Sequence, residues 1–395
     1  MKISVGVFFG GKSVEHEVSI ISAIQAIHAF DRAKYEIVPI YVTKEGDLFV
    51  GNDLDKIEEY RDIPALLKKS RRVFLHREKD RSLLVRYPMK RFGGSVCAEI
   101  DVAFPITHGT NVEDGALQGY LKTLSVPFVG CDVTASAVGM DKYVMKALCK
   151  ENGLPVLDCR RVYVKDYYGD RENAVARIES AMPYPVIVKP VNLGSSVGIG
   201  RAGDASELRE AFEYAFQFTD TALAEPAISR LREINCAVLG DRESATASEC
   251  EEPINSRAVL SYEDKYMSDG GSAKGMSAAK RKLPADIPPE VRQRVRGLAV
   301  ETFRLLGCNG IARIDFLMGA DSGDIWINEI NTIPGSLSFY LWEPLGMSYT
   351  RLLDEAIRLA FKRRREESEI SYSFDTNILA QFNAGSLKGA KLKGA

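Results

Sequence analysis

A lysine stands at the end of a predicted strand, directly before a glycine- and serine-rich loop, in the stretch Pro185–Gly200. The β-branched run before Lys189 favours a strand, and Pro190 ends it because proline has no N–H to donate. The small residues that follow, including Ser195 and Ser196, let backbone N–H groups approach an anion closely. A fixed cation beside such a loop suits a triphosphate. An ordinary Gly/Ser hairpin with a solvent-directed lysine is the alternative.

Two strands further along the chain carry oxygen ligands. Asp315 lies in the predicted strand Ile311–Met318, and Glu329 and Asn331 end the predicted strand Ile325–Ile330. Glu329 and Asn331 are two residues apart, so they share one face of their strand. Such oxygens on adjacent strands are ligands for Mg²⁺ (or Mn²⁺) held jointly with phosphates. Acidic residues on a solvated face are the alternative, but the apolar neighbours favour the metal interpretation.

The composition is that of a globular protein with more than one domain. The chain has 395 residues, 45% of them hydrophobic, and a formal net charge of −2. This charge gives no general attraction to nucleic acid or anionic membrane, and no apolar run reaches membrane-spanning length. Seven cysteines without a CxxC pair predict free thiols, and four scattered histidines argue against zinc. We therefore expect a cytoplasmic protein.

The elements that must position these residues begin with a strand, a helix and a second strand. Lys2–Phe9 and Tyr35–Val42 are predicted strands on either side of a helix over Val18–Phe30, an order that indicates a doubly wound α/β sheet. The double glycine Gly10-Gly11 does not complete GxGxxG, which makes a dehydrogenase the least favoured function. Residues 51–95 are charge-rich and receive no assignment.

Downstream, periodicity and turn residues predict alternating helices and strands. The predicted helices are Ala116–Leu124, Met140–Asn152, Ala174–Ala181, Ala205–Phe216, Arg292–Leu306 and Tyr349–Arg364. The further predicted strands are Ile100–Ile106, Pro127–Gly130, Val162–Val164, Leu223–Pro226 and Glu233–Leu239. The long polar segment 261–289 is typical of either a functional lid or a disordered loop.

Seven stretches, in the same order along the chain, resemble the D-alanine–D-alanine ligases, which are members of the ATP-grasp superfamily. The resemblance covers the chain from Lys2 to about Phe361. The stretches are GGKSVEHEVS (Gly10–Ser19), HGTNVEDGALQG (His108–Gly119), GMDK (Gly139–Lys142), VIVKPVNLGSSVG (Val186–Gly198), REIN (Arg232–Asn235), KY (Lys265–Tyr266), and ARIDF with NEINTIPG (Ala312–Phe316 and Asn328–Gly335).

The resemblance implies an α/β protein with the ATP-grasp fold. Residues 1–135 would form a Rossmann-like N-terminal domain. A central domain (136–226) and a C-terminal domain (227–375), both α+β, would sandwich ATP, with 261–289 as the lid. The remaining residues, 376–395, would be a disordered tail.

The resemblance also implies which residues bind the nucleotide and its metal. Lys142 and Lys189 would contact the α- and β-phosphates under the loop that holds Ser196, and Lys265 would reach the γ-phosphate. The remaining implied contacts are the adenine amino group with Glu225, the ribose hydroxyls with Glu233, and Mg²⁺ (or Mn²⁺) with Asp315, Glu329 and Asn331.

For the amino acid, the resemblance implies that Glu15 pairs with the ammonium of the first D-alanine, near His108. Ser195 and Tyr266 would join Glu15 in a hydrogen-bonded set that closes the loop. Without the resemblance, the interpretation of His108 is a structural histidine, and that of Glu15 is a carboxylate at a helix N-terminus, favoured by the helix dipole. The implied oxyanion site consists of Arg313, which shares a strand face with Asp315, and the backbone N–H of Gly335.

The implied reaction joins two D-alanines through an acyl phosphate, at the expense of ATP, for peptidoglycan precursor synthesis. The expected partners are small molecules, D-alanine and ATP, with no nucleic acid and no membrane; a homodimer is compatible with the family. A D-alanine–D-serine or D-alanine–D-lactate ligase and an ATP-binding protein without ligase activity are the alternatives.

Three features depart from the family pattern. Tyr340 stands where the family has a serine that holds the second substrate's carboxylate, with Ser336 and Ser338 nearby. The predicted lid has Tyr266 and lacks the histidine of D-lactate-forming relatives, which favours an amine as the acceptor. The connector Ala227–Arg232 also differs in length from the commonest pattern. This difference affects the alignment that assigns Glu233 to the ribose hydroxyls.

Overall fold

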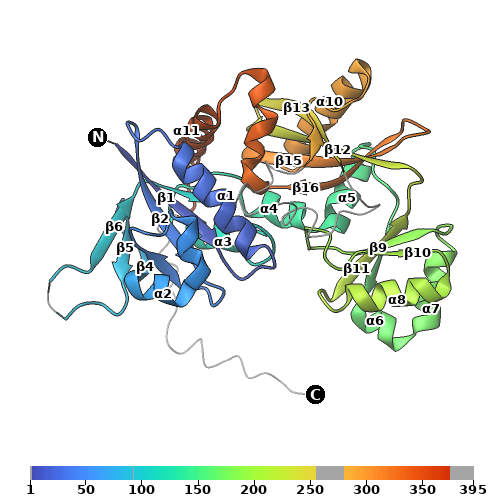
Figure 1. Ribbon diagram of the computed structural model, residues 1–395, viewed down its shortest axis with the longest axis horizontal. Helices are drawn as coiled ribbons and strands as arrows, with labels where there is room; N and C mark the ends of the chain where they lie inside the picture. Colours follow the sequence, from blue (N-terminus) through green and yellow to red (C-terminus); the bar gives the residue numbers. More distant parts are fainter. Residues whose placement is uncertain (1, 92, 255–279, 374–395) are drawn as a thin grey trace, which may run out of the picture.

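A computed structural model describes residues 2–91, 93–254 and 280–373. These residues form three β-sheets with helices packed on them, and the sheets lie side by side in Figure 1. The described part of the chain contains no helix with the length and apolar character needed to span a membrane. The predicted tail (376–395) lies outside the described residues, as do Lys265 and Tyr266 of the predicted lid.

The N-terminal sheet has seven strands in the order β6-β5-β4-β3-β2-β1-β7. Only β1 with β2 and β1 with β7 pair in parallel; the other neighbours are antiparallel. The strands are β1 Ile3–Gly10, β2 Tyr35–Val42, β3 Leu48–Val50, β4 Arg71–Glu78, β5 Arg81–Arg86, β6 Val96–Ile100 and β7 Val102–Pro105. The helices of this part are α1 His16–Ala29, the 3₁₀ helix η1 Ile57–Asp62, α2 Ile63–Lys69 and α3 Ala116–Thr123.

The doubly wound prediction therefore holds only for the start of this sheet. Residues 51–95, which received no assignment, supply η1, α2 and the antiparallel strands β4 and β5. The predicted strand Ile100–Ile106 is confirmed over Val102–Pro105, which is β7, but its start differs: β6 ends at Ile100, and Asp101 accepts a hydrogen bond from the Ser4 N–H (2.7 Å) before β7 begins. Pro127–Gly130 makes one isolated bridge, Ala103 with Phe128, instead of a strand.

Two consecutive helices, α4 Val133–Met140 and α5 Lys142–Glu151, follow the N-terminal sheet. The sequence predicted one helix over Met140–Asn152. In the structure α5 begins only at Lys142, because Asp141 between the two helices has an extended backbone. The Asp141 side chain accepts hydrogen bonds from the Tyr143 and Val144 N–H groups (2.9 and 3.0 Å), so it is the N-cap of α5. This cap fixes the start of the helix that carries Lys142.

The middle sheet is antiparallel, with the order β10-β9-β11-β8. Its alternate residues, such as Val186 and Val188 of β9, are buried against the helices on one face. The strands are β8 Arg160–Tyr163, β9 Val186–Pro190, β10 Gly200–Ala202 and β11 Thr221–Pro226. The helices are α6 Val164–Gly169, α7 Arg171–Glu179 and α8 Ala205–Ala215.

The C-terminal sheet is antiparallel throughout, with the order β14-β13-β12-β15-β16. Sequence reasoning missed β13, whose residues ATASECEEP read as polar although most of them are buried. The strands are β12 Leu231–Gly240, β13 Ala245–Pro253, β14 Arg281–Lys282, β15 Gly310–Gly319 and β16 Ile325–Asn331. The helices are α10 Pro289–Leu305, α11 Tyr349–Ser368 and the 3₁₀ helices η3 Gly335–Leu341 and η4 Glu343–Leu345.

The two faces of the C-terminal sheet have different roles. Alternate residues of β15, Ile314 and Phe316 among them, are buried with α10 in one hydrophobic core. The opposite face packs on α1, η3 and α11 at one end through a second core that includes Leu337 and Trp342. The rest of that face carries polar residues and points toward α5 and the middle sheet (Figure 1).

Candidate active site

A row of polar side chains crosses four strands of the C-terminal sheet on that face. The strand register places Glu251 of β13 opposite Asn235 of β12, Asn235 opposite Asp315 of β15, and Asp315 opposite Glu329 of β16. A β-bulge interrupts the β15–β16 register directly after Asp315, which leaves Asn328 as the extra residue of β16. At this bulge two consecutive polar side chains contact lysines of other elements: Asn328 contacts Lys189 of the middle sheet, and Glu329 contacts Lys142 of α5.

The three predicted metal ligands lie together in this row. Arg313 donates to both carboxylate oxygens of Asp315 (2.6 and 2.7 Å), and the Asn331 amide donates to the same carboxylate (3.0 Å). Burial alone would lower the pKa of Arg313, but the Asp315 charge outweighs it and raises that pKa well above its usual value. The predicted shared face of Arg313 and Asp315 is confirmed.

The remaining predicted ligand, Glu329, forms an ion pair with Lys142 of α5 (3.0 Å). The Lys142 Nζ also donates to the Leu193 carbonyl (2.7 Å), just before the Gly194–Gly198 loop. Within the described residues, no group of three or more His, Cys, Asp and Glu side chains is placed to hold a metal ion. The predicted set consists of two carboxylates and one amide, so it falls outside that definition, and its hard oxygens fit Mg²⁺.

The second predicted phosphate lysine, Lys189, lies at the end of β9 and connects the middle and C-terminal sheets. Its Nζ is 2.8 Å from Asn328 Oδ1 and 2.6 Å from Glu225 of β11. Burial lowers the pKa of Lys189, and the Glu225 charge partly offsets that effect. Lys142 and Lys189 thus both contact the edge strand β16 of the C-terminal sheet, and their predicted role at the α- and β-phosphates stays a prediction.

Glu225 also pairs with a lysine that sequence reasoning missed, Lys146 of α5. Burial alone would raise the pKa of Glu225, but Lys146 and Lys189 together hold it at about 2. A signal was present, because Lys146 is four residues after Lys142 and so lies on the same helix face. The Glu225 carboxylate, predicted to receive the adenine amino group, here contacts two lysines.

The loop after β9 has an unusual backbone at two consecutive serines. Ser195 and Ser196 both adopt positive φ (54° and 59°), a region that residues other than glycine seldom occupy. Glu233, the predicted ribose ligand, lies on β12 two residues before Asn235, on the same face of the strand. Each of these residues keeps its predicted role as a proposal.

On the amino-acid side, Ser195 donates a hydrogen bond to the carboxylate of Glu15, the residue before α1. The contact joins the N-terminal and middle sheets, so two members of the predicted Glu15–Ser195–Tyr266 set are in contact. Gly109 and Gly194 allow it: a Cβ on either would lie about 3 Å from a Glu15 carboxylate oxygen (3.0 and 3.1 Å). Side chains at these two positions would therefore displace Glu15.

His108 is buried, and both ring nitrogens are bonded to protein atoms. Nδ1 lies 2.8 Å from the Ile333 carbonyl and Nε2 lies 2.9 Å from Ser22 Oγ. Burial, against the Ile333 bond, lowers the pKa of His108 to about 4, so the ring is neutral at physiological pH. This geometry is that of the structural histidine which the sequence left as an alternative.

Glu113, in the HGTNVEDGALQG motif, was not singled out from the sequence. Its carboxylate accepts hydrogen bonds from the N–H groups of Gly109 (3.0 Å) and Ile333 (2.8 Å). Burial, with the nearby Glu15 charge, raises its pKa to about 7 although these N–H groups lower it. A motif position between two glycines was the available signal, but its partner 220 residues away could not be read from the sequence.

The segment after Pro334 has an unusual backbone: Ser336, Leu337 and Ser338 have φ of 52°, 50° and 49°. Three consecutive residues in the left-handed region are strained unless their surroundings hold them. Tyr340, at the position of the family's serine, donates its hydroxyl to Glu251 (3.2 Å), and the Arg281 guanidinium lies 3.9 Å from the ring centroid.

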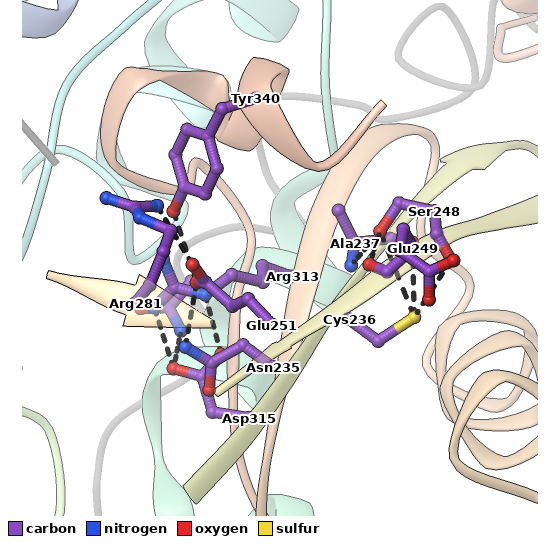
Figure 2. A network of polar contacts seen from close by, with 11 residues as sticks. Asn235, Cys236, Ala237, Ser248, Glu249, Glu251, Arg281, Arg313, Asp315 and Tyr340 are labelled. Atoms are coloured by element: carbon purple, nitrogen blue, oxygen red, sulfur yellow. Dashed lines mark hydrogen bonds and ion pairs between the residues drawn. The ribbon is translucent and has the colours of Figure 1, made fainter. Parts of the chain in front are cut away.

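Figure 2 shows this group in one view, with Tyr340 and Arg281 both directed toward Glu251. Glu251 also accepts from Asn235 (3.1 Å), so three donors hold it in place. The Tyr340 hydroxyl is therefore engaged with the protein, and burial with the Glu251 charge raises its pKa.

Comparisons with known proteins agree with this arrangement. The family model described as "D-ala D-ala ligase N-terminus" matches residues 4–131, and that described as "D-ala D-ala ligase C-terminus" matches residues 148–358. A D-alanine–D-alanine ligase of Thermosipho melanesiensis is 38% identical over 95% of this chain and 98% of its own length. D-alanine–D-alanine ligase A of Salmonella typhimurium is 37% identical, with 92% and 96% covered.

Two solved structures at 30% identity are similar over most of their length. The D-alanine–D-alanine ligase from Coxiella burnetii has a TM-score of 0.77, with 93% of this chain and 96% of that chain covered. The VanG D-Ala:D-Ser ligase from Enterococcus faecalis has a TM-score of 0.76, with 91% and 100% covered. The fold is therefore that of the ATP-grasp enzymes. Within that class, the chain belongs to the D-alanine–D-alanine ligase family.

Proposed function

We propose that this protein ligates two D-alanines to D-alanyl-D-alanine, with conversion of ATP to ADP and phosphate, for peptidoglycan precursor synthesis. The observation that carries the proposal is the convergence of three sheets on one site. Lys189 of the middle sheet contacts the C-terminal sheet at Asn328, and Ser195 contacts Glu15 of the N-terminal part. Family membership supports the same activity.

In the first step, a carboxylate oxygen of D-alanine attacks the γ-phosphorus, and the bond from that phosphorus to ADP breaks. In the second step, the amine of another D-alanine attacks the acyl carbon, loses a proton, and phosphate leaves. Neither step needs a nucleophile from the protein. The contribution of the protein is positioning and charge stabilisation: Lys142, Lys189 and Lys265 toward the phosphates, and Arg313 with the Gly335 N–H toward the oxyanion.

The nucleotide and metal assignments belong to the same proposal. Ser196 and its loop cover the phosphates, Glu225 faces the adenine and Glu233 the ribose. Asp315, Glu329 and Asn331 would hold Mg²⁺ (or Mn²⁺), which when bound neutralises negative charge on the phosphates. The observation in favour is that these three side chains share one face of adjacent strands, with Asn331 donating to Asp315.

The first D-alanine would be held by its ammonium at Glu15, with Ser195 and Tyr266 closing the loop over it and His108 nearby. For the second D-alanine, three buried donors have no hydrogen-bond partner within the described part of the chain: Arg313 Nη1 and the hydroxyls of Ser336 and Ser338. We assign the acceptor carboxylate to this region in preference to Tyr340, whose hydroxyl is directed at Glu251.

The domain limits 1–135, 136–226 and 227–375 are proposed on the same basis, although the first limit falls within α4. A homodimer and a cytoplasmic location stay predictions.

One experiment tests the activity. The purified chain is incubated with ATP, Mg²⁺ and D-alanine, phosphate release is followed, and the dipeptide is identified by mass spectrometry. We expect phosphate release that requires D-alanine. Equal release with L-alanine, or with no amino acid, would contradict the proposal.

The similarity to the VanG enzyme makes D-serine the second candidate for the acceptor. D-alanine and D-serine supplied together at equal concentration distinguish the two. Predominance of D-alanyl-D-serine in the product would replace the leading assignment.

A further inference from the structure

Both main-chain groups of one residue, Ile333, are held by side chains from the HGTNVEDGALQG motif. Its N–H donates to Glu113 Oε1 (2.8 Å), and its carbonyl lies 2.8 Å from His108 Nδ1. We propose that Glu113, with His108 and Ser22, forms a clamp that positions the segment 331–336 for the ligase reaction. This inference rests on the proposed function, and it gives these three residues a positioning role.

The location of Ile333 explains why its position matters. It lies two residues after Asn331, a proposed metal ligand, and two residues before Gly335, whose N–H is the proposed oxyanion donor. Both groups act in the transition state, and a displacement of about 1 Å at such groups can lower the rate about 100-fold. A side chain that fixes Ile333 therefore fixes both groups at once.

A second contact holds the far end of the same segment. The Ser336 N–H donates to Ser22 Oγ (3.0 Å), and the same hydroxyl lies 2.9 Å from His108 Nε2. Ser22 is a buried residue of α1, the helix that follows Glu15. The left-handed backbone of Ser336 to Ser338 begins at this contact, and such a backbone persists only where its surroundings determine it.

Burial of the Glu113 carboxylate costs free energy, so a role in packing alone does not explain a glutamate at this position. It is 7% exposed and forms no ion pair among the described residues, so its charge is stabilised only by neutral donors: the Gly109 and Ile333 N–H groups and the Thr332 hydroxyl (3.4 Å). Burying a carboxylate costs free energy that a neutral side chain would not, and the Glu15 charge adds to that cost. A carboxylate has one advantage here: its two oxygens accept from two backbone N–H groups on different loops.

The second of those N–H groups leads to the amino-acid site. Glu113 Oε2 accepts from the Gly109 N–H (3.0 Å), and Gly109 packs closely against the Glu15 carboxylate. One side chain thus connects the loop that borders the proposed ammonium site with the loop that carries the proposed oxyanion donor. The alternative is that Glu113 stabilises the fold alone and has no specific effect on catalysis.

The test is a comparison of Glu113→Gln with a second buried carboxylate outside the site, Asp241, which differs from Glu113 in its ion pair with Lys362 (2.7 Å). Asp241 is 8% exposed and also accepts from two backbone N–H groups, those of Glu243 (2.9 Å) and Ser244 (2.8 Å). For Glu113→Gln we expect kcat to fall at least about tenfold, with the KM for ATP within about twofold of wild type, because the lost positioning acts in the transition state. For Asp241→Asn we expect a lower melting temperature and a kcat within about twofold of wild type.

Two further variants complete the design. Glu113→Asp keeps both oxygens on a shorter side chain, and we expect it to recover part of the kcat lost in Glu113→Gln. Ser22→Ala removes the contacts to Ser336 and His108 with little change in volume, and it carries the test if Glu113→Gln does not fold. We expect a lower kcat at an unchanged KM for ATP.

An unchanged kcat in every clamp variant that folds would overturn the proposal, as would losses that follow melting temperature in the same way as in Asp241→Asn. Wild-type enzyme without D-alanine-dependent phosphate release would instead refute the proposed function.

Discussion

Two regions of the site balance their charges differently. We call the region of Lys142, Lys146 and Lys189 the lysine side, and the region of Glu15 and Glu113 the carboxylate side. On the lysine side, Lys146 and Lys189 both contact Glu225, and Lys142 contacts Glu329. On the carboxylate side, Glu113 is held by backbone N–H groups and Glu15 accepts from the Ser195 hydroxyl.

The difference indicates how each side meets its substrate. A triphosphate that reaches Lys142 and Lys189 must share them with protein carboxylates, so its binding reorganises existing ion pairs. A substrate ammonium at Glu15 would meet a carboxylate that the Ser195 hydroxyl helps to orient, and it would bring a positive charge to the site. The two sides should therefore respond in separable ways to substitution.

The largest effect is expected on the lysine side. Lys189→Ala should lower kcat/KM for ATP about 100-fold or more, because it removes a cation from the triphosphate and leaves Glu225 with Lys146 alone. Phosphate release at varied ATP concentration measures it. Lys150→Ala is the control, since Lys150 is an exposed lysine of α5 paired with exposed Asp158. A kcat/KM for ATP within a few-fold of wild type in Lys189→Ala would show that the lysine side does not contribute to the reaction with ATP.

A smaller and more selective effect is expected on the carboxylate side. Glu15→Gln should raise the KM for D-alanine at least about tenfold and leave the KM for ATP nearly unchanged, because the charge partner of the ammonium is lost. Initial rates at varied D-alanine and varied ATP separate the two constants. Glu17→Gln, an exposed glutamate of α1 paired with Lys44, is the matched control. Parallel changes in both KM values would show that the two sides do not act separately.

The pH dependence should also be confined to the carboxylate side. The pKa of Glu113 is raised to about 7 by burial and by Glu15, and an ammonium bound at Glu15 would favour the ionised form. D-alanine binding then releases a proton, so affinity falls as pH drops below about 7, by at most about tenfold per pH unit.

The neighbouring His108, with a pKa of about 4, stays neutral over this range. The KM for D-alanine measured between about pH 5.5 and pH 8.5 checks the prediction, with Glu113→Gln as the enzyme that lacks the effect. A wild-type KM that does not vary with pH would contradict it.

The smallest effect is expected at the cap of α5. Asp141→Ala should lower the free energy of unfolding by about 1 kcal/mol, because two N–H groups of the helix lose their acceptor. Denaturant unfolding measures it, and Asp141→Asn, which preserves a capping oxygen, should retain most of the stability. An Asp141→Ala protein as stable as wild type would show that Lys142 and Lys146 are held without the cap.

Much of the site could be predicted from the sequence because its signals are local. Strand alternation placed Arg313 and Asp315 on one face, and their contact confirms it. The run before Lys189 indicated the strand that presents this lysine at a loop. Strand β13 escaped prediction because its polar residues are buried by partners from other elements: Glu251, for example, is surrounded by Asn235, Arg281 and Tyr340.

Backbone periodicity and residue type were enough to predict the strands of Lys189, Asp315 and Glu329, the shared face of Arg313 and Asp315, and a loop after Lys189 that can accept an anion. Only the tertiary structure decided that Lys146 pairs with Glu225, that Glu113 holds Ile333, and that Tyr340 turns to Glu251. These contacts join residues far apart in the chain. The partner of a buried charge is set by which groups lose water together, and that depends on how the three sheets meet.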